Sequence, residues 1–229
     1  MGSGAAWFGL IGTIVVYEAA RRLYKRTGRD WLSPIVLAPL ALVALLLLTG
    51  TTYEGYEEGA RWLTYLLQPA TVAFAVPLYK YRATLKKYAV ELAAGVCAGT
   101  LIAILASEGM ALGWKLSPGT LESLLPRSVT TPIAVEISRS IGGVPALTAV
   151  FVIVTGIFGM LTGPWLIRLL RIRSGISKGL LMGTASHGAG TAKAYELGEL
   201  EGTIANLAMI AAALVLLATL PFVPAGLLA

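Results

Sequence analysis

Long apolar runs separated by short charged stretches dominate this 229-residue chain. Some of these runs contain no charged residue and exceed the roughly 20 residues that cross the core of a bilayer. They lie between Asp30 and Glu54, between Arg139 and Arg168, and after Glu201. Further apolar segments cover residues 5–24, 62–79 and 88–107. Uninterrupted runs of this length predict an all-α polytopic membrane protein.

One polar stretch, Gly179 to Tyr195, interrupts these runs. It reads GLLMGTASHGAGTAKAY and holds four glycines, two threonines, a serine and the only histidine of the chain. Backbone that leaves the helical conformation inside a membrane is tolerated where it lines a cavity or binds a ligand. We therefore expect a broken membrane span here, unwound at Gly188 and Gly190.

Two other segments also predict interrupted helices. Residues 62–79 contain Pro69 and Pro77, and each proline removes a helical donor and clashes with the preceding turn. The segment from Leu125 to Ser138, LPRSVTTPIAVEIS, is too short and too polar to span a bilayer comfortably. A re-entrant hairpin or a second broken helix is favoured there over a surface loop.

Composition and charge agree with a membrane protein. The chain is 56% hydrophobic and 13% charged, whereas soluble domains carry about 25% charged residues. The net charge of +6 is spread over short basic loops rather than gathered on one face with aromatic residues, which argues against a nucleic-acid partner. Basic loops mark the cytoplasmic side, so we expect a multi-pass protein of the inner cell membrane with its N-terminus outside and its C-terminus inside. These loops cover residues 21–29, 80–87 and 168–178.

The order of spans, broken spans and charged loops suggests an internal inverted repeat. Apolar starts in the two halves are offset by about 114 residues, and the charges of corresponding loops are reversed. Repeat 1 covers about 5–107 and repeat 2 about 122–222, within a single integral membrane domain, 1–229. Inverted repeats with discontinuous helices are typical of secondary transporters. The pattern predicts about seven crossings and one hairpin, with an eighth full crossing as the alternative.

The adjacent pair Ser186 and His187 invites comparison with a serine hydrolase. A nucleophile elbow requires glycine two residues before and after the serine, but Thr184 occupies the first of these positions. The only aspartate, Asp30, lies in a basic loop and is not expected to orient the histidine. A single histidine and a single cysteine also exclude a zinc site within this chain. We therefore predict no enzymatic activity, no metal and no cofactor.

Hydroxyl side chains concentrate at the predicted breaks. Free N–H groups and the positive end of a half-helix dipole favour an anion there, and hydroxyl donors would complete a site for a small carboxylate. The alternative for each hydroxyl is a hydrogen bond between helices or to its own turn. The predicted substrate-binding residues are Thr71, Thr130, Thr131, Ser186, His187, Gly188, Gly190 and Thr191.

Titratable side chains beside the breaks are candidates for ion coupling or for compensating the charge of the substrate. One interpretation gives His187 such a role. The other is that His187 is a neutral histidine whose ring is hydrogen-bonded to a neighbouring hydroxyl. A charged side chain can also extend to a membrane interface. The candidates are His187, Glu136, Arg127 and Lys193.

The motif TASHGAGTAKA, residues 184–194, resembles the LrgB/CidB family. QPATVAFAVPLY at 68–79, SLLPRSVTTPIAVEIS at 123–138 and GGVPALTAVFVIVTGIFG at 142–159 resemble further blocks of that family, in the same order. The chain departs from the family pattern at Gln68, where glycine is expected, which puts in question how sharply the third segment breaks. Arg127 replaces the usual lysine and Lys193 the usual arginine, which keeps the charge but changes its geometry.

The resemblance implies two classes of function. Bacterial members are described as antiholin-like or holin-like regulators of murein hydrolase export and cell lysis. A plastid relative exchanges glycolate and glycerate, and bacterial operons of this type are connected with pyruvate. Together with the polar breaks, this predicts a secondary transporter of small monocarboxylates that works by alternating access. The expected partners are a small carboxylate, the lipid bilayer, a second copy in a homodimer and a small LrgA/CidA-type membrane protein.

Overall fold

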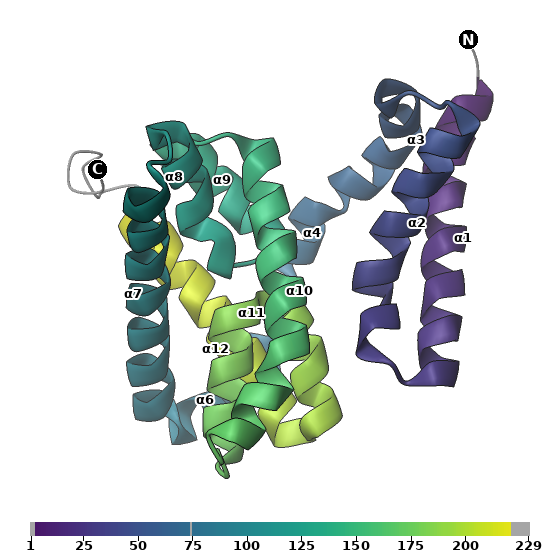
Figure 1. Cartoon of the computed structure of the whole chain (residues 1–229). Coiled ribbons are helices and arrows are strands. Elements are labelled where there is room, and N and C mark those ends of the chain that lie inside the picture. The colour runs from purple at the N-terminus through teal and green to yellow at the C-terminus, as the bar shows by residue number, and fades with distance from the viewer. Residues whose placement is uncertain (1–2, 74, 221–229) are drawn as a thin grey trace. The chain divides into compact units, whose positions relative to one another are not determined.

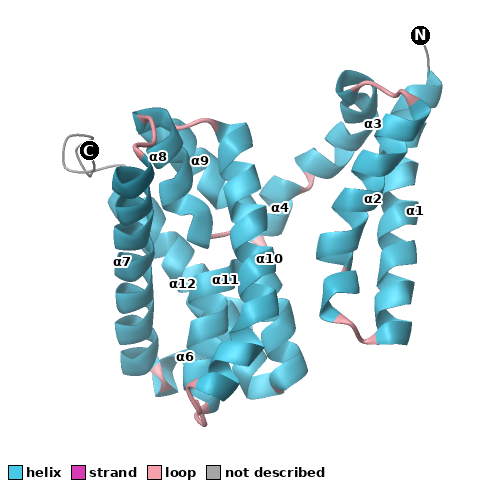
Figure 2. Ribbon diagram, in the orientation of Figure 1, coloured by secondary structure: helices cyan, strands magenta, loops and turns pink. Residues whose placement is uncertain are grey.

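The computed structural model describes residues 3–73 and 75–220, and every regular element among them is helical (Figure 1 and Figure 2). The chain divides into two compact units, Met1–Val72 and Ala73–Ala229. The helical architecture confirms the all-α part of the predicted fold class. The number of crossings, the inverted repeats and the single domain stay predictions.

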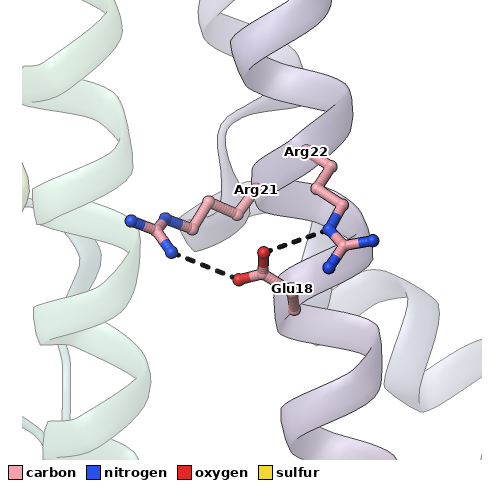
Figure 3. A network of polar contacts seen from close by, with 3 residues as sticks. All are labelled: Glu18, Arg21 and Arg22. Atoms are coloured by element: carbon pink, nitrogen blue, oxygen red, sulfur yellow. Dashed lines mark hydrogen bonds and ion pairs between the residues drawn. The ribbon is translucent and has the colours of Figure 1, made fainter.

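The first unit is a small helical assembly in which α1 packs on α3. Its helices are α1 (Ser3–Thr27), η1 (Asp30–Leu32), α2 (Pro34–Thr49), α3 (Tyr53–Tyr65) and α4 (Leu67–Val72). Gly9 permits the close approach, because a Cβ at this position would clash with the carbonyl oxygen of Tyr56. Further along α1, Glu18 accepts hydrogen bonds from Arg21 and Arg22 at 3.3 and 3.1 Å (Figure 3).

The predicted break in the third apolar segment is confirmed. Helix α3 ends at Tyr65, and α4 and α5 (Ala75–Lys80) follow as separate short helices. Pro69 and Pro77 each occupy the third position of their helix. First-turn N–H groups have no partner within the helix, so a proline costs little there. The prolines therefore lie in the first turns of new helices and do not kink a continuous one.

The second unit contains the helices that, among the described residues, are long and apolar enough to cross a membrane by length and composition. These are α7 (Ala89–Trp114), α10 (Pro145–Leu169) and α12 (Glu199–Thr219). The other helices of this unit are α5, α6 (Arg82–Lys87), α8 (Pro118–Leu124), η2 (Leu125–Ser128), α9 (Thr131–Ile141) and α11 (Gly175–Leu197).

Residues 118–141 fold back on themselves and form what we call the first hairpin. Helices α8 and η2 make its first arm and α9 makes its second. The backbone N–H of Val144, just after α9, donates to the hydroxyl of Ser123 in α8 at 2.7 Å. The end of α8 therefore lies beside the end of α9, and residues 128–131 form the turn between them, the first tip. Of the two conformations predicted for Leu125 to Ser138, a re-entrant hairpin or a second broken helix, the chain path is that of a hairpin.

Helix α11 also reverses direction. His187 has backbone angles of φ 38° and ψ −128°, which are not helical. In a straight helix Met182 and Gly190 would lie about 12 Å apart along the axis. Instead, a Cβ at Gly190 would clash with the carbonyl oxygen of Met182. Residues 175–197 are therefore a second hairpin, and residues 186–188 are the second tip.

This reversal corrects the expected broken span. A crossing at this point would separate the basic loop before α11 from the acidic stretch after it. Lys178, near the start of α11, instead forms an ion pair with Glu201 of α12 at 3.8 Å. A Cβ at Gly179 would also lie only 2.6 Å from the carbonyl oxygen of Glu201. The chain path of α11 is therefore a hairpin and not the expected broken span.

Within the second unit, the two hairpins pack against opposite ends of α10 (Figure 1). Near the start of α10, the Thr148 hydroxyl donates to Ser138 of the first hairpin at 2.6 Å. Near the end of α10, Gly163 gives space to the side chain of Met182 in the second hairpin. The hairpins therefore extend toward each other from the two ends of the unit.

Candidate functional site

The imidazole of His187 is buried at the second tip, with 8% of the residue exposed. Its Nε2 atom lies 2.9 Å from the backbone carbonyl oxygen of Val152 in α10. A carbonyl only accepts hydrogen bonds, so Nε2 carries a proton and donates. The other ring nitrogen, Nδ1, has no hydrogen-bond partner among the described residues. His187 is therefore held by a backbone carbonyl, and not by a neighbouring hydroxyl as the second interpretation had it.

Two glycines of α10 make room for the second tip. A Cβ at Gly156 would lie 2.7 Å from Nε2 of His187, and a Cβ at Gly159 would clash with the Ser186 hydroxyl. Neither glycine was predicted from the sequence, because both lie within an apolar run. Their spacing of three residues, which places both on one helix face, is the signal that would have identified them.

The backbone of the second tip is strained. A φ of 38° at His187 lies in the left-handed region that favours glycine, and such a conformation costs other residues on the order of 1–3 kcal/mol. The predicted unwinding at Gly188 and Gly190 is wrong, since the non-helical residue precedes both. Gly190 serves the close packing against Met182, and a Cβ at Gly188 would meet no neighbour within 4 Å.

Val152 connects the two tips. Its carbonyl oxygen accepts the hydrogen bond from His187, and its side chain is fully buried in an apolar cluster with Leu125 and Val129 of the first hairpin. Helix α11 also contacts η2 directly. The two tips therefore approach each other beside α10.

Thr130 at the first tip occupies the N-cap position of α9, but its side chain makes no capping hydrogen bond. Its buried Oγ1 has no hydrogen-bond partner among the described residues. The first N–H groups of a helix lack partners within the helix. The N-terminus of α9 and an unbonded hydroxyl thus lie together at the first tip, and both favour an anion.

Hydrogen bonding divides the buried hydroxyl groups of the second unit into two sets. In the first set the hydroxyl bonds to protein: Ser107 donates to the Ala103 carbonyl at 2.8 Å, and Thr184 to the Leu180 carbonyl at 2.8 Å. In the second set it has no hydrogen-bond partner among the described residues, and this set comprises Thr100, Ser128, Thr130 and Ser186. Within this set, Oγ1 of Thr100 and Oγ1 of Thr130 are fully buried atoms. An unsatisfied buried polar group costs about 1–3 kcal/mol. A ligand held by the hydroxyls at the tips would recover part of that cost.

The charged candidates are placed differently from one another. Arg127 lies directly before the first tip, is half-buried and forms no ion pair or hydrogen bond with a described residue. Glu136 is exposed on α9 and pairs with Arg139 at 2.9 Å. Lys193 donates to Glu196 at 2.7 Å, further along the second hairpin. Of these three candidates, only Arg127 lies next to a tip.

The remaining predicted binding residues are only partly brought together. Thr131 and Gly188 lie at the first and second tips. Thr191 lies one turn beyond the second tip, with its hydroxyl 3.8 Å from the Met209 sulfur. The side chain of Thr71 falls outside the described residues, so its role stays a prediction.

The geometry also bears on catalysis and metal binding. With Nε2 of His187 donating to the Val152 carbonyl, Nδ1 is the nitrogen that could act as a base, and it forms no hydrogen bond with the hydroxyl of Ser186. In the part of the chain that the structure describes, His, Cys, Asp and Glu side chains form no group of three or more that could hold a metal.

Comparison with known proteins identifies the family. Residues 13–225 match the model of the LrgB-like family. The chain belongs to this family. It is 50% identical over 210 residues to "Uncharacterized protein YwbG" of Bacillus subtilis (strain 168), and the aligned region covers 92% of this chain and 93% of that relative. It is 34% identical over 203 residues to "Holin-like protein CidB" of Staphylococcus aureus (strain N315), and the aligned region covers 89% of this chain and 89% of that relative. No solved structure matches this LrgB-like chain.

Proposed function

We propose that this LrgB-like protein is a secondary carrier that binds a small monocarboxylate between the first and second tips. The observation that carries the proposal is the buried Oγ1 of Thr130 at the first tip, which has no hydrogen-bond partner among the described residues. Ser128 and Ser186, on buried residues at the two tips, also form no hydrogen bond with a described residue. An ionised carboxylate only accepts hydrogen bonds, so hydroxyl donors and helix N-terminal amides suit it.

Positive charge at the site comes from two sources. Helix α9 and the second arm of α11 both begin at a tip, and each helix N-terminus is equivalent to about half a positive charge. Arg127 lies next to the first tip without an ion-pair partner among the described residues, and a guanidinium binds a carboxylate through two parallel hydrogen bonds. Nδ1 of His187 can accept a hydrogen bond from a substrate hydroxyl, or donate one when protonated.

The size and class of the substrate follow from the packing and the family. Gly156 and Gly159 hold His187 and Ser186 tightly against α10, which favours a ligand of few atoms. The resemblance to carriers of glycolate, glycerate and pyruvate supports acids with a second oxygen substituent. We therefore expect glycolate, glycerate or pyruvate as the substrate.

Alternating access would come from movement of the second unit. Both hairpins and the helices α7, α10 and α12 belong to that one compact unit, so the site can travel as a single body in an elevator-type cycle. Hairpins that open from opposite ends of the unit would give the site a separate route to each side of the inner membrane. A homodimer and a small LrgA/CidA-type partner belong to the same proposal, and are tested by the mass of the purified protein and by co-purification.

Uptake by proteoliposomes tests the proposal. We expect saturable uptake of labelled glycolate or pyruvate that is absent from protein-free liposomes. Thr130→Val and His187→Ala should each reduce uptake about tenfold, since a hydrogen bond to a charged group contributes about 1.5–3 kcal/mol. Ser107→Ala is the matched control, because that hydroxyl bonds within its own helix. Absence of saturable uptake would contradict a carrier.

The holin-like relatives support a second candidate, a regulator of murein hydrolase export and cell lysis that acts by oligomerisation. A pore of this kind releases solutes with little regard to their chemistry. Entrapped carboxyfluorescein distinguishes the two functions in the same proteoliposomes. Dye release without saturable carboxylate uptake would favour the holin-like function, and dye retention with saturable uptake would favour the carrier.

A further inference from the structure

Helix α7 carries a buried hydroxyl that belongs to neither hairpin. Thr100 is 6% exposed, and its Oγ1 has no hydrogen-bond partner among the described residues. A threonine within a helix commonly bonds to the carbonyl one turn earlier. Ser107, also buried on α7, does this through the Ala103 carbonyl at 2.8 Å. The Thr100 hydroxyl is instead left for another partner.

Helix α7 contacts both hairpins, and these contacts lie on either side of Thr100 along the helix. The preceding residue, Gly99, faces the second hairpin, because a Cβ there would lie 3.0 Å from Oγ1 of Thr184. One turn after Thr100, Ile104 packs against the buried cluster that includes residues of the first hairpin, and α7 contacts η2 of that hairpin. Thr100 lies between these two contacts and is itself buried.

We propose that Thr100 is part of the anion site and that its hydroxyl hydrogen-bonds the bound small acid from α7. This inference rests on the carrier function proposed above. It gives the site a contact on a long helix, in addition to the contacts on the two hairpins. It also explains why the hydroxyl of Thr100, like those of Ser128, Thr130 and Ser186, has no hydrogen-bond partner among the described residues.

Three variants test the role of Thr100. Thr100→Val keeps the shape of the side chain and removes the hydroxyl, Thr100→Ser keeps the hydroxyl, and Ser107→Ala removes a hydroxyl that is already bonded within α7. The measurements are the KM for uptake of labelled glycolate or pyruvate in proteoliposomes, and the thermal shift that the same acid produces on the purified protein. A ligand that binds the folded state stabilises it by an amount set by its concentration relative to its Kd, so the shift reports binding independently of transport.

We expect Thr100→Val to raise KM about tenfold and to lose most of the acid-induced thermal shift. Thr100→Ser and Ser107→Ala should stay within about twofold of wild type. Without the acid, Thr100→Val should be at least as thermally stable as wild type, because valine leaves no buried hydroxyl unsatisfied.

Saturable wild-type uptake with an unchanged KM and thermal shift in Thr100→Val would overturn this inference and leave the carrier function standing. A wild-type protein that transports and binds neither acid would overturn both. Equal losses in Thr100→Val and Ser107→Ala would also overturn it, since they would indicate a packing role for α7.

Discussion

Gly156 of α10 lies directly against the imidazole of His187: a Cβ at this glycine would be 2.5 Å from Cε1 of the ring. We expect Gly156→Ala to displace the imidazole and break its hydrogen bond to Val152, with a loss of about 1–3 kcal/mol in stability and a large loss of uptake. Gly109→Ala is the control, because a Cβ there meets no neighbour within 4 Å. Thermal unfolding and uptake of both variants check this, and equal behaviour of the two would count against the contact.

The reversal of α11 predicts opposite outcomes for two neighbouring glycines. Gly190→Ala should destabilise the protein by about 1–3 kcal/mol, because the new Cβ meets the Met182 carbonyl, which belongs to the backbone and cannot move aside. Gly188→Ala should change stability by less than about 1 kcal/mol, because its Cβ would point into open space. Thermal unfolding of the purified variants measures both. A continuous helix through these positions would tolerate alanine at each.

Backbone strain at the second tip predicts an unusual order of stability at His187. His187→Ala and His187→Gly both lose the hydrogen bond to Val152, but only alanine keeps a Cβ at a φ of 38°. The glycine variant should therefore be more stable by about 1 kcal/mol. Chemical or thermal unfolding compares the two, and a more stable alanine variant would show that the strain is absent. Uptake should be impaired in both.

The second hairpin predicts the sidedness of its two ends. With Cys97 replaced by serine, single cysteines at Ser177 and Leu200, both exposed, should react with an impermeant thiol reagent from the same side of the membrane. A cysteine at exposed Ser117, before the first hairpin, should react from the opposite side. A crossing of α11 would instead separate Ser177 from Leu200.

The interrupted helices were largely predictable from the sequence. Proline, glycine and hydroxyl residues gathered inside apolar runs are poor for continuous helices, and breaks occur at the third segment, at the first tip and at His187. The direction of the chain after the break in α11 was not predictable in the same way. It depends on the packing of Gly179 and Gly183 against α12, and hydropathy cannot distinguish such contact glycines from other small residues.

Individual members of the site were harder to predict than its location. Thr130 and Ser186 stand out because they lie beside a break, and the structure places both at a tip. Thr100 lies within an ordinary apolar helix, so nothing in the sequence separates it from Ser107. Glu136 was chosen for its nearness to a break along the chain, but it lies on the exposed side of α9 with Arg139. A residue's direction around a helix, and not its distance along it, decides whether it reaches the site.

Protection of the tips by substrate tests the binding site most directly. In a protein with Cys97 replaced by serine, single cysteines at Thr130 and at Ser186 are labelled with a small membrane-permeant thiol reagent, with and without glycolate or pyruvate. We predict that either acid slows labelling at both tips in a concentration-dependent manner and leaves a cysteine at Gly109 unaffected. Equal labelling rates at both tips with and without the acids, at concentrations that saturate uptake, would contradict binding between the hairpins.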